Sequence, residues 1–221
     1  MNINRIASAA FFIAALIMPL TSHANLVFNV SLNTSPLIGN PNGPFTIDFQ
    51  LNDGSGSNDA NNSATLSNFS LGGGSLSGSA ATSGGASGAL SSIATLIDSS
   101  FLNSFDQKFN PGSKLSFDVS LTTHVDGGTT PDGFFFSLLD GAGNQIPTTG
   151  LLSSFLEVDL TSANPAIQVF GGVGTYAGIG SPLVTPVPIP ATLPLFLSGM
   201  LLLARRSVAM GRHRHCVPFE N

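Results

Sequence analysis

The sequence predicts an all-β protein, an antiparallel β-sandwich or jelly roll, with an apolar segment at each end of the chain. In several short runs, apolar and polar residues alternate with a period of two, as in strands that bury one face. Pieces rich in Gly, Asn, Asp and Ser, such as NDGSGSNDANN and GGGSLSGSAATSGGASG, separate these runs and predict turns. The length of 221 residues suits one domain plus targeting segments.

Residues 1–24 have the three-part order of a secretory signal peptide. Arg5 supplies a basic start, the apolar stretch Ile6–Ile17 follows, and Pro19 breaks it. Small residues then lead to Ala24, which predicts cleavage after this residue by signal peptidase. We therefore expect an N-terminal signal helix and an exported mature protein. A buried core helix is the alternative.

The sandwich is predicted over residues 25–176. Its alternating runs are NLVFNVSL, PFTIDFQL, KLSFDVSL and FLEVDL, and GFFFSLL is apolar on both faces, which suits a central strand. The segment ALSSIATLIDSSFLNSFDQKF has apolar residues near helical spacing as well as along one strand face. Its β-branched and aromatic content favours strands with a break near Asp98.

The middle of the chain is acidic and sparsely charged. From residue 25 to residue 190, Lys108 and Lys114 are the basic residues against eleven acidic ones. Such a surface repels phosphate backbones, which argues against a nucleic-acid partner. The single cysteine, Cys216, lies close to the C-terminus, so the sandwich cannot form an internal disulfide.

The C-terminal part combines prolines, an apolar run and arginines. A Gly/Pro-rich linker is predicted at 177–190, and the uncharged run 191–204 follows it. As a helix this run would extend about 21 Å, which is short of a bilayer core of roughly 30 Å. Arg205 and Arg206 fit a cytoplasmic stop. We expect a short transmembrane helix at 191–204 and a basic cytoplasmic tail at 205–221.

This order of features resembles the C-terminal sorting signal of PEP-CTERM proteins, in its Val-Pro-x-Pro-Ala variant. The matching residues are Val187, Pro188, Ile189, Pro190 and Ala191, followed by the apolar run and the two arginines. The run is a few residues shorter, and the tail longer, than is usual for this signal. The resemblance implies a substrate of exosortase, a membrane-embedded cysteine transpeptidase-like enzyme of Gram-negative bacteria that make extracellular polysaccharide. It also implies transient anchoring in the inner membrane before transfer to the cell surface or the exterior.

The middle region resembles the ectodomain of a PEP-CTERM family over roughly residues 26–175. The similarity lies in the stretches IDFQLNDGSGSNDANNSATLSNFSLGGGS, NPGSKLSFDVSLTT and PDGFFFSLLDGAGNQIPTTG. This second resemblance implies no particular activity.

One loop offers oxygen ligands at alternate positions. Asp53, Ser55, Ser57 and Asp59 suit Ca²⁺, which takes hard oxygen donors on flexible loops. The loop lacks a distal bidentate Glu, so a solvated hairpin loop is the alternative. No other cofactor is expected.

Three further motifs could be functional, but each also has a simpler structural explanation. His124, Asp126 and Asp132 could bind a metal or transfer protons, but Asp-Gly turns explain the two acids equally well. The spacing Gly172-x-Gly174-x-x-Ala177 mimics a dinucleotide loop, yet prolines follow where a helix is needed. His213, His215 and Cys216 lie among arginines that suit a membrane-flanking cluster.

These observations favour a non-catalytic, exported protein of the cell surface or extracellular matrix. A structural or adhesive role associated with exopolysaccharide or biofilm is expected, with exosortase, signal peptidase and the membrane as partners. The alternative is a lectin-like sandwich that binds carbohydrate, in a Ca²⁺-dependent or independent way. The absence of Trp and the single Tyr argue against a sugar-binding face. A secreted hydrolase is a third hypothesis, for which no catalytic pair stands out.

Overall fold

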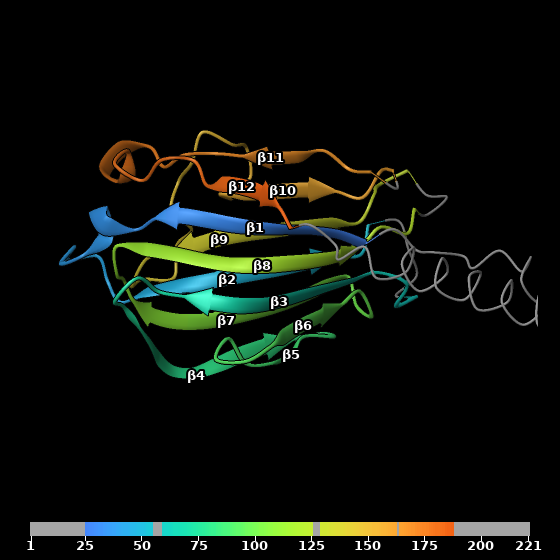
Figure 1. The fold of residues 1–221 in the computed structure, drawn as a ribbon, viewed down its shortest axis with the longest axis horizontal. Helices are drawn as coiled ribbons and strands as arrows, with labels where there is room; N and C mark the ends of the chain where they lie inside the picture. Colours follow the sequence, from blue (N-terminus) through green and yellow to red (C-terminus); the bar gives the residue numbers. More distant parts are fainter. Residues whose placement is uncertain (1–24, 55–58, 126–128, 163, 188–221) are drawn as a thin grey trace, which may run out of the picture. The chain divides into compact units, whose positions relative to one another are not determined.

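The computed structural model describes residues 25–54, 59–125, 129–162 and 164–187, and within them the chain forms two antiparallel six-stranded sheets (Figure 1). The predicted all-β class is confirmed for this part, which contains no α-helix. Its helical elements are two short 3-10 turns, η1 (Ser35–Leu37) and η2 (Gly174–Tyr176). Among the described residues, no helix has the length and apolar character needed to cross a bilayer. The predicted signal helix with Ala24, the run 191–204, and the arginines Arg205 and Arg206 lie outside the described residues.

The strands divide equally between two sheets, here called sheet A and sheet B. Sheet A has the order β12 (Leu183–Pro186), β1 (Asn25–Asn33), β8 (Lys114–Thr122), β3 (Ser63–Ser70), β6 (Ala94–Ile97) and β5 (Ser87–Gly88). Sheet B has the order β11 (Ile167–Val169), β10 (Leu156–Asp159), β9 (Gly133–Leu139), β2 (Phe45–Asn52), β7 (Leu102–Asn110) and β4 (Ser75–Ser83).

The predicted alternation sets the register of the central strands. β1 and β8 pair so that Val30 lies opposite Phe117 and Phe28 opposite Val119, and all four side chains are buried. The side chains of successive strand residues point to opposite faces, so the polar residues between them turn outward. GFFFSLL forms β9 between β10 and β2, which confirms its predicted central position.

The segment with two competing periodicities forms strands, so the helical alternative is wrong. β6 belongs to sheet A and β7 to sheet B, and the break between them spans the predicted position at Asp98. The backbone N–H of Asp98 donates to the carbonyl of Asn62 at 3.2 Å, which fixes the point where the chain leaves sheet A. The break therefore carries the chain across the sandwich.

The Gly/Ser-rich piece predicted as turns contains strand β4. This strand pairs with β7 at the edge of sheet B, with an irregular register between Ser77 and Ala81. The buried Gln107 donates its amide hydrogens to the carbonyls of Ser77 at 2.8 Å and Gly78 at 3.2 Å. Backbone pairing and the Gln107 amide thus hold β4 in place, together with Leu76 and Ala80, which are partly buried against the core.

The sandwich continues beyond Tyr176, where the sequence predicts its end. Ile179 is fully buried, and β12 pairs with β1 so that Pro186 lies opposite Phe28. The compact unit ends at Pro186, so residues 177–186 belong to the domain rather than to the predicted linker. Because β12 is an edge strand, the missing N–H of Pro186 does not interrupt the sheet.

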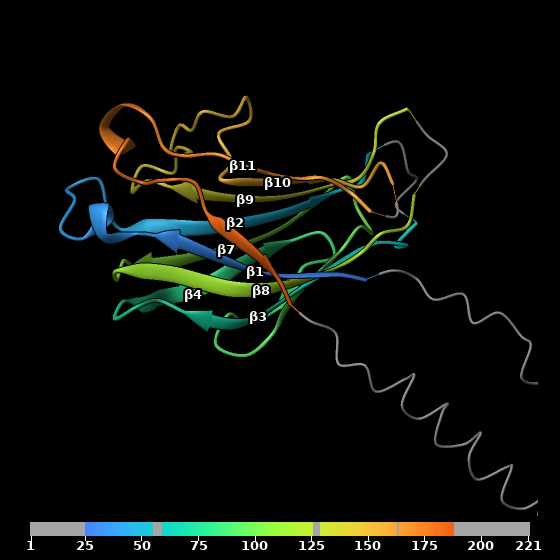
Figure 2. The same cartoon turned by 45° about the horizontal axis from the view of Figure 1, so that its top comes forward.

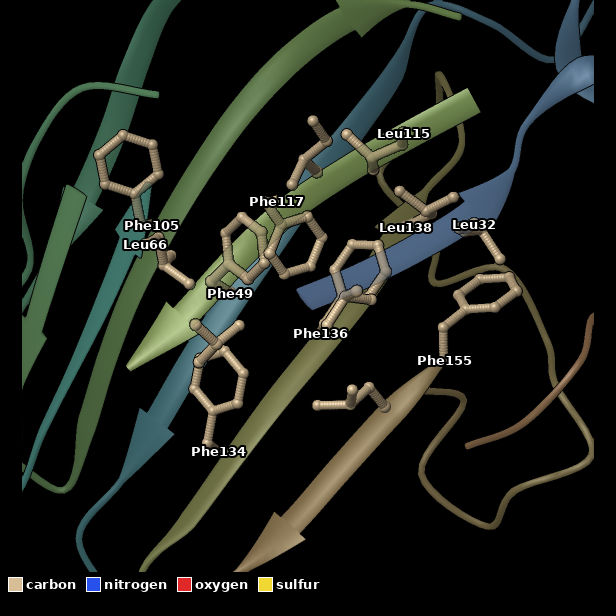
Figure 3. Packing of buried hydrophobic residues seen from close by; sticks show 14 of the residues in the cluster. Leu32, Phe49, Leu66, Phe105, Leu115, Phe117, Phe134, Phe136, Leu138 and Phe155 are labelled. Carbon is tan, nitrogen blue, oxygen red and sulfur yellow. The ribbon is translucent and has the colours of Figure 1, made fainter. Parts of the chain in front are cut away.

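Phenylalanine rings fill the space between the sheets (Figure 3). The ring centroid of Phe117 in sheet A lies 5.0 Å from that of Phe49 and 5.1 Å from that of Phe136 in sheet B, in edge-on geometry. Phe49 and Phe136 are themselves stacked at 5.3 Å, and all three rings are fully buried. Such aromatic pairs add to the free energy gained from apolar burial.

We expect Phe49→Ala to lower the free energy of unfolding by about 3–5 kcal/mol, because it opens a cavity where the two sheets meet. Urea denaturation followed by circular dichroism measures the change. Phe101→Ala is the matched control, since Phe101 is 71% exposed and its loss should change stability by less than about 0.5 kcal/mol. Equal losses in both variants would contradict the central role of Phe49.

Candidate functional site

A hollow of about 230 Å³ lies on the outer face of sheet B. β2 buries Phe49 and Leu51 in the core, so the alternate residues Gln50 and Asn52 face outward. The same alternation turns Phe135 and Ser137 of β9 outward. The residues around the hollow are Gln50, Asn52, Phe135, Ser137, Gln145, Leu152 and Ser154.

The loop between β9 and β10 forms one wall of the hollow. Backbone hydrogen bonds attach it to β9, from Ile146 N–H to the carbonyl of Leu138 at 2.7 Å and from Phe155 N–H to that of Phe136 at 2.8 Å. Ile146 and Phe155 are also fully buried. These anchors position Gln145 and Ser154 over the sheet without a regular strand.

The side chains that line the hollow carry no charge. Most of them are polar, and Phe135 and Leu152 are the apolar ones. Ser154 donates its hydroxyl to Glu157 Oε1 at 2.5 Å, which orients the hydroxyl group. Asn52 Oδ1 is buried and accepts no hydrogen bond within the described part of the chain. Amides and hydroxyls both donate and accept hydrogen bonds, so this lining suits a neutral ligand that does the same.

A pair of aspartates lies beside the hollow. Asp48 and Asp106 face each other across β2 and β7, and Gln50 donates to Asp48 Oδ2 at 2.9 Å. Asp48 is 3% exposed, and its burial, together with the neighbouring Asp106 carboxyl, raises its pKa from 3.8 to about 7. Burial also raises the pKa of Asp106. Gln50 thus connects the hollow to a pair that carries a proton near neutral pH.

A second acidic pair lies where the β2–β3, β6–β7 and β8–β9 connections meet, at the right-hand end in Figures 1 and 2; we call this the loop end. Asn62 joins the pair, because its backbone N–H donates to Asp98 Oδ2 at 2.9 Å and its Nδ2 donates to Asp132 Oδ2 at 2.8 Å. Burial raises the pKa of Asp98 to about 7, and Asp132 adds to this rise.

The residues of the predicted Ca²⁺ loop do not form a common site within the described part of the chain. Asp53 is buried and Asp59 is exposed, while Ser55 and Ser57 of the predicted Ca²⁺ loop lie outside the described residues. The backbone N–H after Asp53, that of Gly54, donates to Asp132 Oδ1 at 2.9 Å. Considering only described residues, no three His, Cys, Asp or Glu side chains form a group that could hold a metal ion.

The structure also places some residues of the other motifs that the sequence predicts. His124 and Asp132 both contact Asn62, His124 through its backbone N–H at 2.8 Å from Asn62 Oδ1, whereas Asp126 lies outside the described residues. The glycine-rich spacing at Gly172 and Gly174 leads only into the turn η2. Val187 follows β12 directly, and Pro188, Ile189, Pro190 and Ala191 lie outside the described residues, as does the cluster of His213, His215 and Cys216.

Sequence reasoning missed the hollow. The alternation within PFTIDFQL already places Gln50 and Asn52 outward, but nothing in the sequence shows that the β9–β10 loop covers them. No family model, curated protein or solved structure matches the chain.

We expect the stability of the protein to fall as the pH rises from about 4 to about 7. The pKa of Asp48 is higher in the folded protein than its ordinary value of 3.8, so the folded state binds the proton more tightly in this window. Asp48→Asn should reduce this slope and raise the Tm at pH 8, because the amide mimics the protonated acid.

Asp140→Asn is the control with the opposite sign. Backbone N–H groups, that of Asn144 foremost, lower the pKa of Asp140, so its carboxylate contributes stability that is lost only on acidification. This variant should not raise the Tm at pH 8. Thermal unfolding between pH 4 and pH 8 makes the comparison, and an unchanged pH slope in Asp48→Asn would contradict the expectation.

Proposed function

We propose that the chain is an exported protein of the cell surface or extracellular matrix, processed by exosortase and associated with exopolysaccharide. Its role in this proposal is structural or adhesive rather than catalytic. The observation that carries the proposal is the position of the folded domain's end. The sandwich ends at Pro186, immediately before Val187, so the Val-Pro-Ile-Pro-Ala motif follows the last strand directly. A processing enzyme could reach a motif there without unfolding the sandwich.

The finer features of the fold belong to the same proposal. We infer a jelly-roll-like winding, because β1 pairs with the distant β8 and β2 with the distant β7, in opposite sheets. A signal helix at 1–24, a transmembrane helix at 191–204 and a cytoplasmic tail at 205–221 complete the proposed arrangement, which supposes a Gram-negative host.

Mass spectrometry of the mature protein tests this processing. We expect an N-terminus at Asn25 and a C-terminus near the motif, with loss of the arginine-rich tail in cells that contain exosortase. Deleting the host's exosortase should preserve the tail and retain the protein at the inner membrane. Replacing Pro188 and Pro190 by Ala in the same cells should have the same effect. A protein with both ends intact in normal cells would overturn the proposal.

Carbohydrate binding is the second candidate function, and the hollow on sheet B favours it. A sugar presents hydroxyls that donate and accept hydrogen bonds, as well as an apolar ring face. Gln50 and Asn52 can match the hydroxyls, and Phe135 offers an aromatic surface for the ring. This site would join the protein to neutral glycans of the matrix.

Retention on immobilised neutral polysaccharides tests the hollow. We expect Asn52→Ala to weaken retention about tenfold or more, because each lost hydrogen bond in a desolvated site costs on the order of 1–3 kcal/mol. Asn29→Ala is the matched control, since Asn29 lies on the outer face of sheet A and pairs with Asp118. If the wild-type protein shows no retention on any neutral glycan, carbohydrate binding by the hollow is wrong.

A further inference from the structure

We propose that the loop end of the sandwich binds one calcium ion, with the carboxylates of Asp98 and Asp132 as direct ligands. This site differs from the loop set that the sequence predicts, because it unites residues from the β6–β7 and β8–β9 connections. It does not depend on exosortase processing or on glycan binding.

One carboxylate oxygen of the pair lacks a hydrogen-bond donor, and the two carboxyl groups lie within hydrogen-bonding reach of each other. Asp98 is fully buried, and its Oδ1 accepts no hydrogen bond within the described part of the chain. Its other oxygen, Oδ2, is occupied by the backbone N–H of Asn62. Asp132 is 2% exposed, and both of its oxygens are fixed by donors, from Gly54 and from Asn62. The two carboxyl groups are therefore held rigidly and side by side.

No lysine or arginine in the described part of the chain neutralises this pair. Lys114 begins β8, whereas the loop end lies beyond Thr122 at the opposite end of that strand. Lys108 lies near the end of β7 and pairs with Thr46, away from the β6–β7 connection. His124, which is present at the loop end, contacts Asn62 through its backbone. Two buried carboxylates with no lysine or arginine near them in the described part of the chain are stabilised by a proton or a metal ion.

The surroundings fit calcium better than a softer or smaller metal. Asp59, which is exposed at the loop end, interacts electrostatically with Asp98 and adds negative charge on the solvent side. The buried Asp53 immediately precedes Gly54, so a further carboxyl group lies at this end. Ca²⁺ accepts six to eight oxygens in flexible geometry and completes its shell with carbonyls and water, so a third acidic side chain is not required.

Calcium titration of the mature protein tests the site. After treatment with EDTA, CaCl₂ added at pH 7.5 should raise the Tm by several degrees in a saturable way, with half-saturation at about 10⁻⁴–10⁻³ M, the range of extracellular calcium modules. Isothermal titration calorimetry should give one site per chain. Asp98→Asn should abolish both responses. Asp48→Asn is the matched control, because it alters the other aspartate pair, on sheet B, and should leave both responses intact.

Stability in EDTA separates loss of the site from loss of the fold. There, Asp98→Asn should be at least as stable as the wild-type protein, since the amide removes a repulsion between two carboxylates. Absence of any Tm rise up to about 10 mM Ca²⁺ would overturn the proposal. An undiminished rise in Asp98→Asn would overturn it as well. A wild-type protein that responds to pH but not to Ca²⁺ would show that a shared proton, rather than an ion, holds the pair.

Discussion

The contact of Phe117 with Phe49 and Phe136 is the interaction on which the rest of the structure depends. These rings join sheet A to sheet B at separations of 5.0 and 5.1 Å, in a domain that has no cysteine to link its sheets. Ionised side chains are also few, at 9% of the chain. Apolar burial between the sheets must therefore supply most of the stability that offsets the loss of chain entropy. Phenylalanine suits this position because its ring fills space and needs no hydrogen-bond partner.

The same packing determines where polar chemistry can occur. Once Phe49 faces the core, the pleat directs Asp48 and Gln50 to the outer face of sheet B, where the β9–β10 loop covers part of the surface. At the loop end, three connections come together and enclose Asp98 and Asp132. In these pairs Asp48, Asp98 and Asp132 are buried, whereas Asp106 is partly exposed and Lys108 lies two residues further along β7. The sandwich therefore gathers carboxyl groups at two places, and at each of them burial raises the pKa of one aspartate, Asp48 or Asp98.

The strands with strong alternation could be predicted from sequence, because β1, β2, β8 and β10 each bury one face. Strand β4 could not, since SLSGSAATS lacks apolar periodicity and pairs through its backbone at a sheet edge. β12 could not be predicted either, because its proline and the glycine-rich segment before it are typical of a linker. The site residues were harder still. Asn62 and Asp132 lie 70 positions apart, and no local pattern indicates that Asn62 joins Asp132 to Asp98.

The edge position of β12 has a mechanical consequence. This strand is four residues long, is bonded to β1 alone, and ends where the chain leaves the domain. Any tension applied through the C-terminal segment would enter the fold through this short ladder, and not through the phenylalanine core. β12 would peel or slide from β1 first, while the remaining strands stayed packed. In a protein that holds two surfaces together, such a strand would detach from the sheet under force and could pair with β1 again when the force is removed.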